Sequence, residues 1–249
     1  MTLTMMFIVL LVGICAGFIN VLAGGGSLLT LPMLIFLNLP SAMANGTNRI
    51  AILAQNITAI ASFRNSGIFH WKLAVFLSFP AVLGSIAGSK MAIELSDDLF
   101  NRILSIVMVF VLITIIVQPQ RWFTQVTSNM TTKKRVLLFI VFLLVGFYGG
   151  FIQAGVGLVI VMMLTLTTGM NLVHINSLKV FIVAIYTFSS IIVFLINDQI
   201  HWGYGLVLAL GNSIGAIIGS KSAVKKGEGF VRIVMVVAVL FMSVRLWFT

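Results

Sequence analysis

The sequence is poor in cysteine and in acidic residues. Its 249 residues include one cysteine and five Asp or Glu, against 15 Lys or Arg. The single cysteine, Cys15, excludes a disulfide framework within the chain, and the spacing of a cysteine metal site is missing. We therefore expect no metal site and no cofactor.

The five acidic residues all lie in or beside predicted loops, so no apolar segment contains an internal carboxylate. Many proton- or sodium-coupled transporters place a carboxylate inside the membrane as a relay or an ion ligand. An aspartyl intramembrane protease needs a pair of them. The sequence also lacks the G-x-S-x-G and H-E-x-x-H strings of common hydrolases. No catalytic residue is assigned, and an intramembrane enzyme is the least favoured function.

Hydrophobic residues make up 60% of the chain and charged residues 8%, which is far from the composition of soluble domains. Many apolar stretches approach the length of about 20 residues that a membrane-spanning helix needs. The net charge of +10 would suggest nucleic acid in a soluble protein. Here most basic residues lie in short connections between apolar runs, where they indicate topology. We expect an all-α polytopic membrane protein that does not bind nucleic acid.

The two halves of the chain resemble each other. A shift of 131 residues superposes positions from about 23 to about 92 on the second half without a gap. Upstream of the glycine cluster the shift is 133, which implies a two-residue gap. The matches include Gly24 with Gly155, Gly26 with Gly157, Asn45 with Asn176, His70 and Trp71 with His201 and Trp202, and Gly88, Ser89 and Lys90 with Gly219, Ser220 and Lys221. The chain is predicted to be a duplication.

Each half contains five apolar segments. The second segment of each half, at 11 to 13 residues, is too short for an ordinary crossing and predicts a broken half-helix, a re-entrant segment or a short crossing, giving eight to ten membrane segments in all. The predicted domains are a first membrane repeat at 1–118, a basic cytoplasmic linker at 119–135 and a second membrane repeat at 136–249. The segments are 5–23, 27–39, 47–63, 71–91 and 99–118, then 136–154, 158–168, 177–196, 202–220 and 230–248.

Charge asymmetry favours inverted halves. If the short segments cross, the most basic connections share one side, which is the cytoplasm. Both termini and most of the acidic residues then lie outside. If the short segments do not cross, the halves are parallel and the asymmetry is lost. The basic connections hold Arg64 with Lys72, Arg121 with Lys133, Lys134 and Arg135, and Lys221 with Lys225, Lys226 and Arg232.

Glycine-rich strings interrupt the apolar pattern at matching places in both halves. Such breaks leave backbone N–H groups without partners inside the membrane, and the N-terminus of the short helix that follows is partially positive. This arrangement attracts anions. The alternative is that the glycines only allow close helix packing. The predicted site residues here are Gly24, Gly25, Gly26 and Ser27, with Gln153, Gly155 and Gly157 in the second half.

Polar and cationic residues begin the third segment of each half. Arg offers a planar fork and Lys a point charge for an oxyanion, while Asn, Ser and Thr donate further hydrogen bonds. The alternative is that both cations reach from helix ends to the lipid headgroups. The predicted substrate-binding residues are Asn45, Thr47, Asn48 and Arg49, with Asn176, Ser177 and Lys179 in the second half.

These strings, in this order and with the two His-Trp pairs, resemble the sulfite exporter TauE/SafE family of membrane permeases over nearly the whole chain. The resemblance implies a protein of the cytoplasmic membrane that moves sulfur-containing anions such as sulfite or organosulfonates. One departure is Leu178, which follows Ser177 where a second hydroxyl is expected. The substrate is therefore left open.

The expected function is a secondary transporter that moves a small anion by alternating access between the two halves. A passive anion channel is the alternative, because both functions need cations and donors along a pathway. The expected partners are the anionic substrate and the lipid bilayer. Whether copies of the chain form a homo-oligomer is left open.

Overall fold

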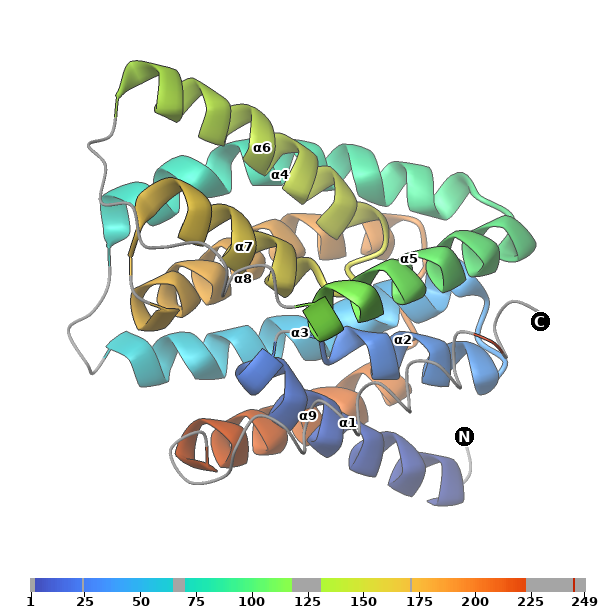
Figure 1. Ribbon diagram of the computed structural model, residues 1–249. Coiled ribbons are helices and arrows are strands. Elements are labelled where there is room, and N and C mark those ends of the chain that lie inside the picture. Colours follow the sequence, from blue (N-terminus) through green and yellow to red (C-terminus); the bar gives the residue numbers. More distant parts are fainter. Residues whose placement is uncertain are drawn as a thin grey trace.

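A computed structural model describes residues 3–23, 25–64, 70–117, 131–170, 172–222 and 244. Every regular element in these ranges is an α-helix, as the composition predicted. The tenth expected segment, at 230–248, and most of the 119–135 linker lie outside the described residues. The helices are α1 Leu3–Ala23, α2 Ser27–Phe36, α3 Ser41–Arg64, α4 Trp71–Glu94, α5 Asp97–Val117, α6 Thr132–Phe151, α7 Val156–Thr168, α8 Leu172–Ile196 and α9 Trp202–Ser222 (Figure 1).

Within these ranges, four helices are long and apolar enough to cross a membrane. Their apolar windows are Leu3–Asn20, Trp71–Glu94, Thr132–Phe151 and Val173–Ile196. Large apolar side chains also cover much of the exposed surface, including Phe79 at 63% and Phe110 at 69% exposure. Such a surface suits lipid and would be costly in water. The protein is therefore embedded in a membrane.

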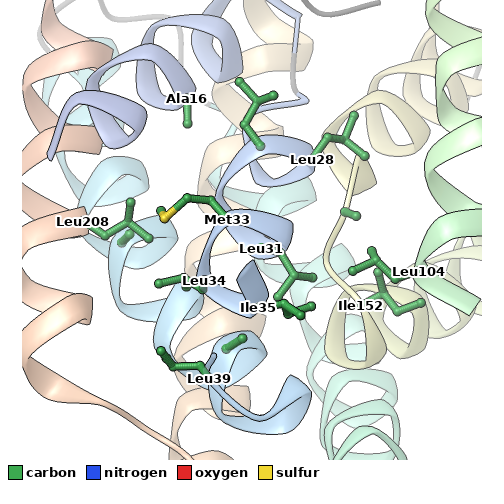
Figure 2. Packing of buried hydrophobic residues seen from close by; sticks show 14 of the residues in the cluster. Ala16, Leu28, Leu31, Met33, Leu34, Ile35, Leu39, Leu104, Ile152 and Leu208 are labelled. Carbon is green, nitrogen blue, oxygen red and sulfur yellow. The ribbon is translucent and has the colours of Figure 1, made fainter. Parts of the chain in front are cut away.

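The two short segments are short helices, as predicted. Helix α2 has 10 residues and α7 has 13, so at 1.5 Å per residue they extend about 15 and 20 Å, less than a hydrocarbon core of about 30 Å. Nine of the ten α2 residues are buried. Figure 2 shows its side chains among those of Ala16, Leu104, Ile152 and Leu208. Helix α2 is thus surrounded by protein.

Two helices begin earlier than the sequence indicated. Helix α3 starts at Ser41, so the Asn-Gly-Thr-Asn string lies inside the helix and the expected start at position 47 is wrong. Helix α8 starts at Leu172, where position 177 was expected. In α3 the polar side chains of the string bond to other helices, which removes the cost of burying them.

The helices pack in pairs that join the two halves. Helix α1 runs along α9, and α4 runs along α6, while α3 and α8 lie between these pairs (Figure 1). Exchanging each helix of the first half for its repeat in the second half turns the α1–α9 pair into the α6–α4 pair. The packing therefore follows the sequence duplication.

Glycines allow both pairs to approach closely. A Cβ at Gly84 of α4 would lie 2.0 Å from the Leu143 carbonyl oxygen of α6, and one at Gly215 of α9 would lie 2.0 Å from the Ile14 carbonyl oxygen of α1. Backbone atoms cannot give way as a flexible side chain does. Gly84 and Gly88 on α4, and Gly211 and Gly215 on α9, thus serve close helix packing.

We expect Gly84→Ala to destabilise the protein by about 1–3 kcal/mol, because the added methyl group forces α4 and α6 apart. Gly205→Ala is the matched control, since its Cβ would lie 3.5 Å from the nearest heavy atom. Unfolding in detergent, followed by the loss of monodisperse protein on heating, measures both. Equal stability of the two variants would contradict the close contact.

Candidate functional site

The two glycine breaks meet in the centre of the protein. The Ser27 hydroxyl donates to the Gln153 carbonyl oxygen at 3.2 Å and accepts from the Gly155 N–H at 3.4 Å. Gln153 and Gly155 have φ of 68° and 70°, in the left-handed region that turns the chain out of α6 and into α7. The start of α2 therefore lies against the start of α7.

Neither short helix has a side-chain cap at its N-terminus. The first amides of a helix have no partner inside the helix and carry partial positive charge. Two such ends lie close together here. They provide a positive potential without any side chain.

A small cavity lies where the two helices begin. Its volume is about 20 Å³, which is room for about one water molecule. The first half contributes Asn20, Ser27, Ile52 and Asn56, and the second half contributes Gln153, Val156, Gly157, Lys179 and Val183. Both halves therefore build the cavity, and none of the described residues that line it is acidic.

Among the described residues that line this cavity, Lys179 is the one with a charge. It is 7% exposed, and its ammonium group has no hydrogen bond or ion pair with any residue in the described ranges. A buried charge is costly unless it is paired. The cavity thus presents a cation for which the described protein supplies no counter-charge, and an anion would supply it.

Arg49, the second predicted cation, is 0% exposed and does not line the cavity. Its Nη1 donates to the carbonyl oxygen of Gly149 at 2.9 Å and to Gln153 Oε1 at 3.1 Å. Its Nη2 donates to Asn45 Oδ1 at 3.1 Å and to the Gly150 carbonyl oxygen. Its partners are thus neutral oxygens: two carbonyl groups at the end of α6 and the side-chain oxygens of Asn45 and Gln153.

Arg49 and Asn45 together cap α6. The last carbonyl groups of a helix have no partner inside it, and Asn45 Nδ2 satisfies a further one by donating to the Phe151 oxygen at 2.6 Å. The guanidinium also lies 4.8 Å from the centre of the Phe194 ring, within range for a cation–π contact. These contacts hold the backbone that carries Gln153.

The other predicted residues of the first half link α3 to its neighbours. Asn48 Oδ1 accepts from the Thr30 hydroxyl of α2 at 2.7 Å. The Thr47 hydroxyl accepts from the His201 N–H, just before α9, at 2.8 Å. Neither residue lines the cavity. Gly24 lies outside the described residues, Gly25 is buried, and Gly26 N–H donates to Asn20 Oδ1 at 3.4 Å.

In the second half, Gln153, Gly157 and Lys179 line the cavity. Gly155 instead faces a separate apolar groove between α5, α6 and α7. Asn176 and Ser177 are near the start of α8 and do not line the cavity, and the Ser177 hydroxyl donates to the His174 carbonyl oxygen at 2.8 Å. The structure therefore brings together Ser27, Gln153, Gly157 and Lys179 from the predicted set.

Two cavity amides were not predicted. Asn20 is half-buried near the end of α1, and Asn56 is 3% exposed in the middle of α3. A signal for Asn20 existed, because the shift of 133 residues aligns it with Gln153. Asn56 aligns with Thr187 at the shift of 131, and Thr187 accepts a hydrogen bond from Gln153 Nε2 at 3.3 Å.

Helices that cross a membrane, around a central cationic cavity built at broken segments, define a membrane transport protein. The chain belongs to the sulfite exporter TauE/SafE family, whose sequence profile matches residues 9–246. The family was expected from the motifs, and the match confirms it.

Several curated relatives are similar to nearly the whole chain. A "Probable membrane transporter protein" of Haemophilus influenzae is 26% identical over 94% of this chain and 91% of its own length. "Probable membrane transporter protein YfcA" of Escherichia coli K12 is 26% identical over 94% of this chain and 87% of its own length. A third, "Probable membrane transporter protein ORF9" of a Sinorhizobium species, is 24% identical over 93% of this chain and 88% of its own length. No solved structure matches the chain significantly.

We expect Arg49→Met to lower the free energy of unfolding by about 3 kcal/mol or more, because buried carbonyl groups lose their donors. Arg49→Lys should lower the free energy of unfolding by less, since lysine keeps the positive charge and one donor position. Denaturation in detergent measures both, and hydrogen exchange at residues 149–157 reports the loosening of the break.

Lys179→Met is the matched control for this experiment. Its ammonium group has no described partner to lose, so stability should stay the same or rise. If Arg49→Met keeps full stability and the exchange at 149–157 is unchanged, Arg49 does not cap α6.

Proposed function

We propose that this protein is a secondary transporter for a small sulfur-containing oxyanion, such as sulfite or an organosulfonate. The observation that carries the proposal is Lys179, a buried cation without a described partner that faces the cavity between two helix N-termini. The anion binds there, and its negative charge replaces the missing counter-charge. The sulfur chemistry comes from the family description, since the relatives are named only as membrane transporters.

Neutral donors complete the proposed site. Asn20, Asn56 and Gln153 provide amides beside Lys179. The Ser27 hydroxyl now donates to the Gln153 carbonyl oxygen, so it donates to the anion only after it turns toward the cavity. An oxyanion has several oxygen atoms that each accept more than one hydrogen bond. The N–H groups at the starts of α2 and α7 add further positive potential. Arg49 acts as a positioning residue, because it holds Gln153 by a hydrogen bond and does not itself line the cavity.

Alternating access is the mechanism that we infer for this site. Cavity residues such as Gln153 and Lys179 are 2% and 7% exposed, so the site is nearly closed to both sides. A volume of about 20 Å³ is also too small for sulfur with its oxygens. Binding therefore requires a second, more open state. A channel would instead need a continuous path, and for this reason the carrier is favoured.

The proposed arrangement in the membrane follows the charge pattern. The halves are inverted in the cytoplasmic membrane, with the basic linker at 119–135 in the cytoplasm and both termini outside. Support comes from the exchange of helix pairs between the halves and from the short helices, whose starts meet near the centre.

To test the site, radiolabelled sulfite, thiosulfate, sulfoacetate and sulfate are offered to proteoliposomes. We expect saturable uptake of at least one anion, and Lys179→Gln should reduce it by tenfold or more, since loss of about 1.4 kcal/mol of binding is a factor of ten. Lys90→Gln removes the same charge at an exposed position of α4 and should transport normally. If both variants lose uptake equally, the loss of any positive charge reduces transport, and Lys179 has no special role in the cavity.

Counterflow separates the carrier from the channel. Proteoliposomes loaded with unlabelled substrate should accumulate labelled substrate above its external concentration for a limited time, because a carrier exchanges one bound anion for another. With the membrane potential held at zero by valinomycin and equal K⁺ on both sides, a channel dissipates the label gradient and gives no overshoot. Flux that fails to saturate and shows no overshoot would favour the passive channel.

A further inference from the structure

The two equivalent helix pairs pack in different registers. In the α4–α6 pair, the Cβ positions of Gly84 and Gly88 face the carbonyl oxygens of Leu143 and Phe147. In the α1–α9 pair, the Cβ positions of Gly211 and Gly215 face the carbonyl oxygens of Leu10 and Ile14. The repeat aligns Leu143 with Leu10 but Gly84 with Gly215. The repeat would therefore place Gly215 at Leu10. The glycine that faces Leu10 is instead Gly211, one helical turn earlier in α9.

The glycines of α6 and α1, on the other side of each interface, show the same difference in register. Gly150 of α6 faces the carbonyl oxygen of Ser85. Its repeat in α1, Gly17, faces the carbonyl oxygen of Asn212, four positions before the residue that aligns with Ser85. Four residues correspond to about 6 Å along a helix. The two pairs therefore differ by a slide of one turn.

Glycine spacing allows α9 to use either register. Gly211, Gly215 and Gly219 recur at each turn of α9. In the present register Gly211 and Gly215 face α1, and a shift of one turn would place Gly215 and Gly219 there. Helix α4 has Pro80 where α9 has Gly211, and a proline ring cannot fit where even a Cβ would lie 2.6 Å from a carbonyl oxygen. The α4–α6 pair is thus confined to one register.

Hydrogen bonds also hold the α4–α6 pair more firmly. The Ser85 hydroxyl bonds to the Tyr186 carbonyl oxygen at 3.2 Å and to the Ser189 hydroxyl at 2.9 Å. The Ser89 hydroxyl donates to the Gly150 carbonyl oxygen at 3.2 Å. These bonds tie α4 to α8 and to the end of α6.

The α1–α9 pair is joined by a hydrogen bond from the Tyr204 hydroxyl to Met5 Sδ at 3.4 Å, and sulfur is a weak acceptor. Asn212 Nδ2 of α9 donates to Gln55 Oε1 of α3 at 3.3 Å, and Asn212 Oδ1 is buried without a hydrogen-bond partner there. An unsatisfied buried acceptor lowers the stability of this arrangement. The present register is therefore less firmly held at α1–α9 than at α4–α6.

We infer that α9 slides by one turn along α1 during transport, while α4 and α6 stay fixed. The inference rests on the proposed alternating access. Helix α1 carries Asn20, and α9 packs on α3, which carries Ile52 and Asn56. The slide therefore moves the first-half wall of the cavity, and the second-half wall with Gln153 and Lys179 remains in place. One-turn ratchets of packed helices are a known form of two-state change.

The test measures distances between spin labels in a protein whose Cys15 is replaced by serine. One pair of labels is at Phe7 and Ile214, on α1 and α9. The matched pair is at Ile140 and Leu83, the repeat-equivalent positions on α6 and α4, and all four residues are exposed. The slide shortens the Phe7–Ile214 separation by up to about 6 Å and leaves the Ile140–Leu83 separation unchanged.

Two glycine substitutions bias the register without any ligand. Gly211→Ala blocks the present register, so the shorter Phe7–Ile214 distance should dominate. Gly219→Ala blocks the other register, so the longer distance should persist and transport of sulfite should fall by tenfold or more. An unchanged distance in Gly211→Ala, or normal transport by Gly219→Ala, would overturn the slide. The transport arm decides the matter if Gly211→Ala does not fold.

The two proposals fail in different ways. If no anion is transported but Gly211→Ala shortens the distance, the slide stands and the proposed substrate is wrong. If sulfite is transported while both label pairs keep one distance in every variant, the proposed function stands and the slide is overturned. Movement of the Ile140–Leu83 pair in place of Phe7–Ile214 would also overturn it.

Discussion

A helix that ends inside a membrane leaves carbonyl groups without donors, and the architecture of this protein depends on how α6 resolves that problem. Arg49 and Asn45 reach from α3 to the carbonyl oxygens of Gly149, Gly150 and Phe151. The break that follows is thereby held in place, with Gln153 and Gly155 in the left-handed region. The position of α7, and with it one wall of the cavity, follows from this cap.

Composition, the duplication and the glycine breaks predicted much of this arrangement. The helices and the short second segments follow from apolar length and repeated interruption. The partners of Arg49 could not be predicted, because carbonyl oxygens neutralise a buried cation as an anion does, and a sequence does not show where a distant helix ends. Asn56 was missed since a lone amide in a long helix has no distinguishing pattern. The α3 boundary was misplaced because its polar string bonds to other helices.

Within the described residues, the helices of the two repeats pair in equivalent ways, but the polar residues that the repeat aligns differ. Lys179 aligns with Asn48, Ser27 with Leu158 and Arg49 with Val180. The cation of the cavity thus comes from one half, and the hydroxyl group comes from the other. The cap on α6 has no counterpart at the equivalent position in α8. Neither half alone contributes all the residues of the proposed site, so the asymmetry in register accompanies an asymmetry in the polar residues.

The burial of α2 has a consequence for biogenesis. Ten residues are too few for a stable independent span, so the bilayer alone does not fix this segment. Its apolar cluster includes Leu104, Ile152 and Leu208, which follow it in the chain (Figure 2). During synthesis these neighbours emerge from the ribosome after α2. The order of translation therefore differs from the order of assembly, and α2 reaches its final place only once helices of the second half have entered the membrane.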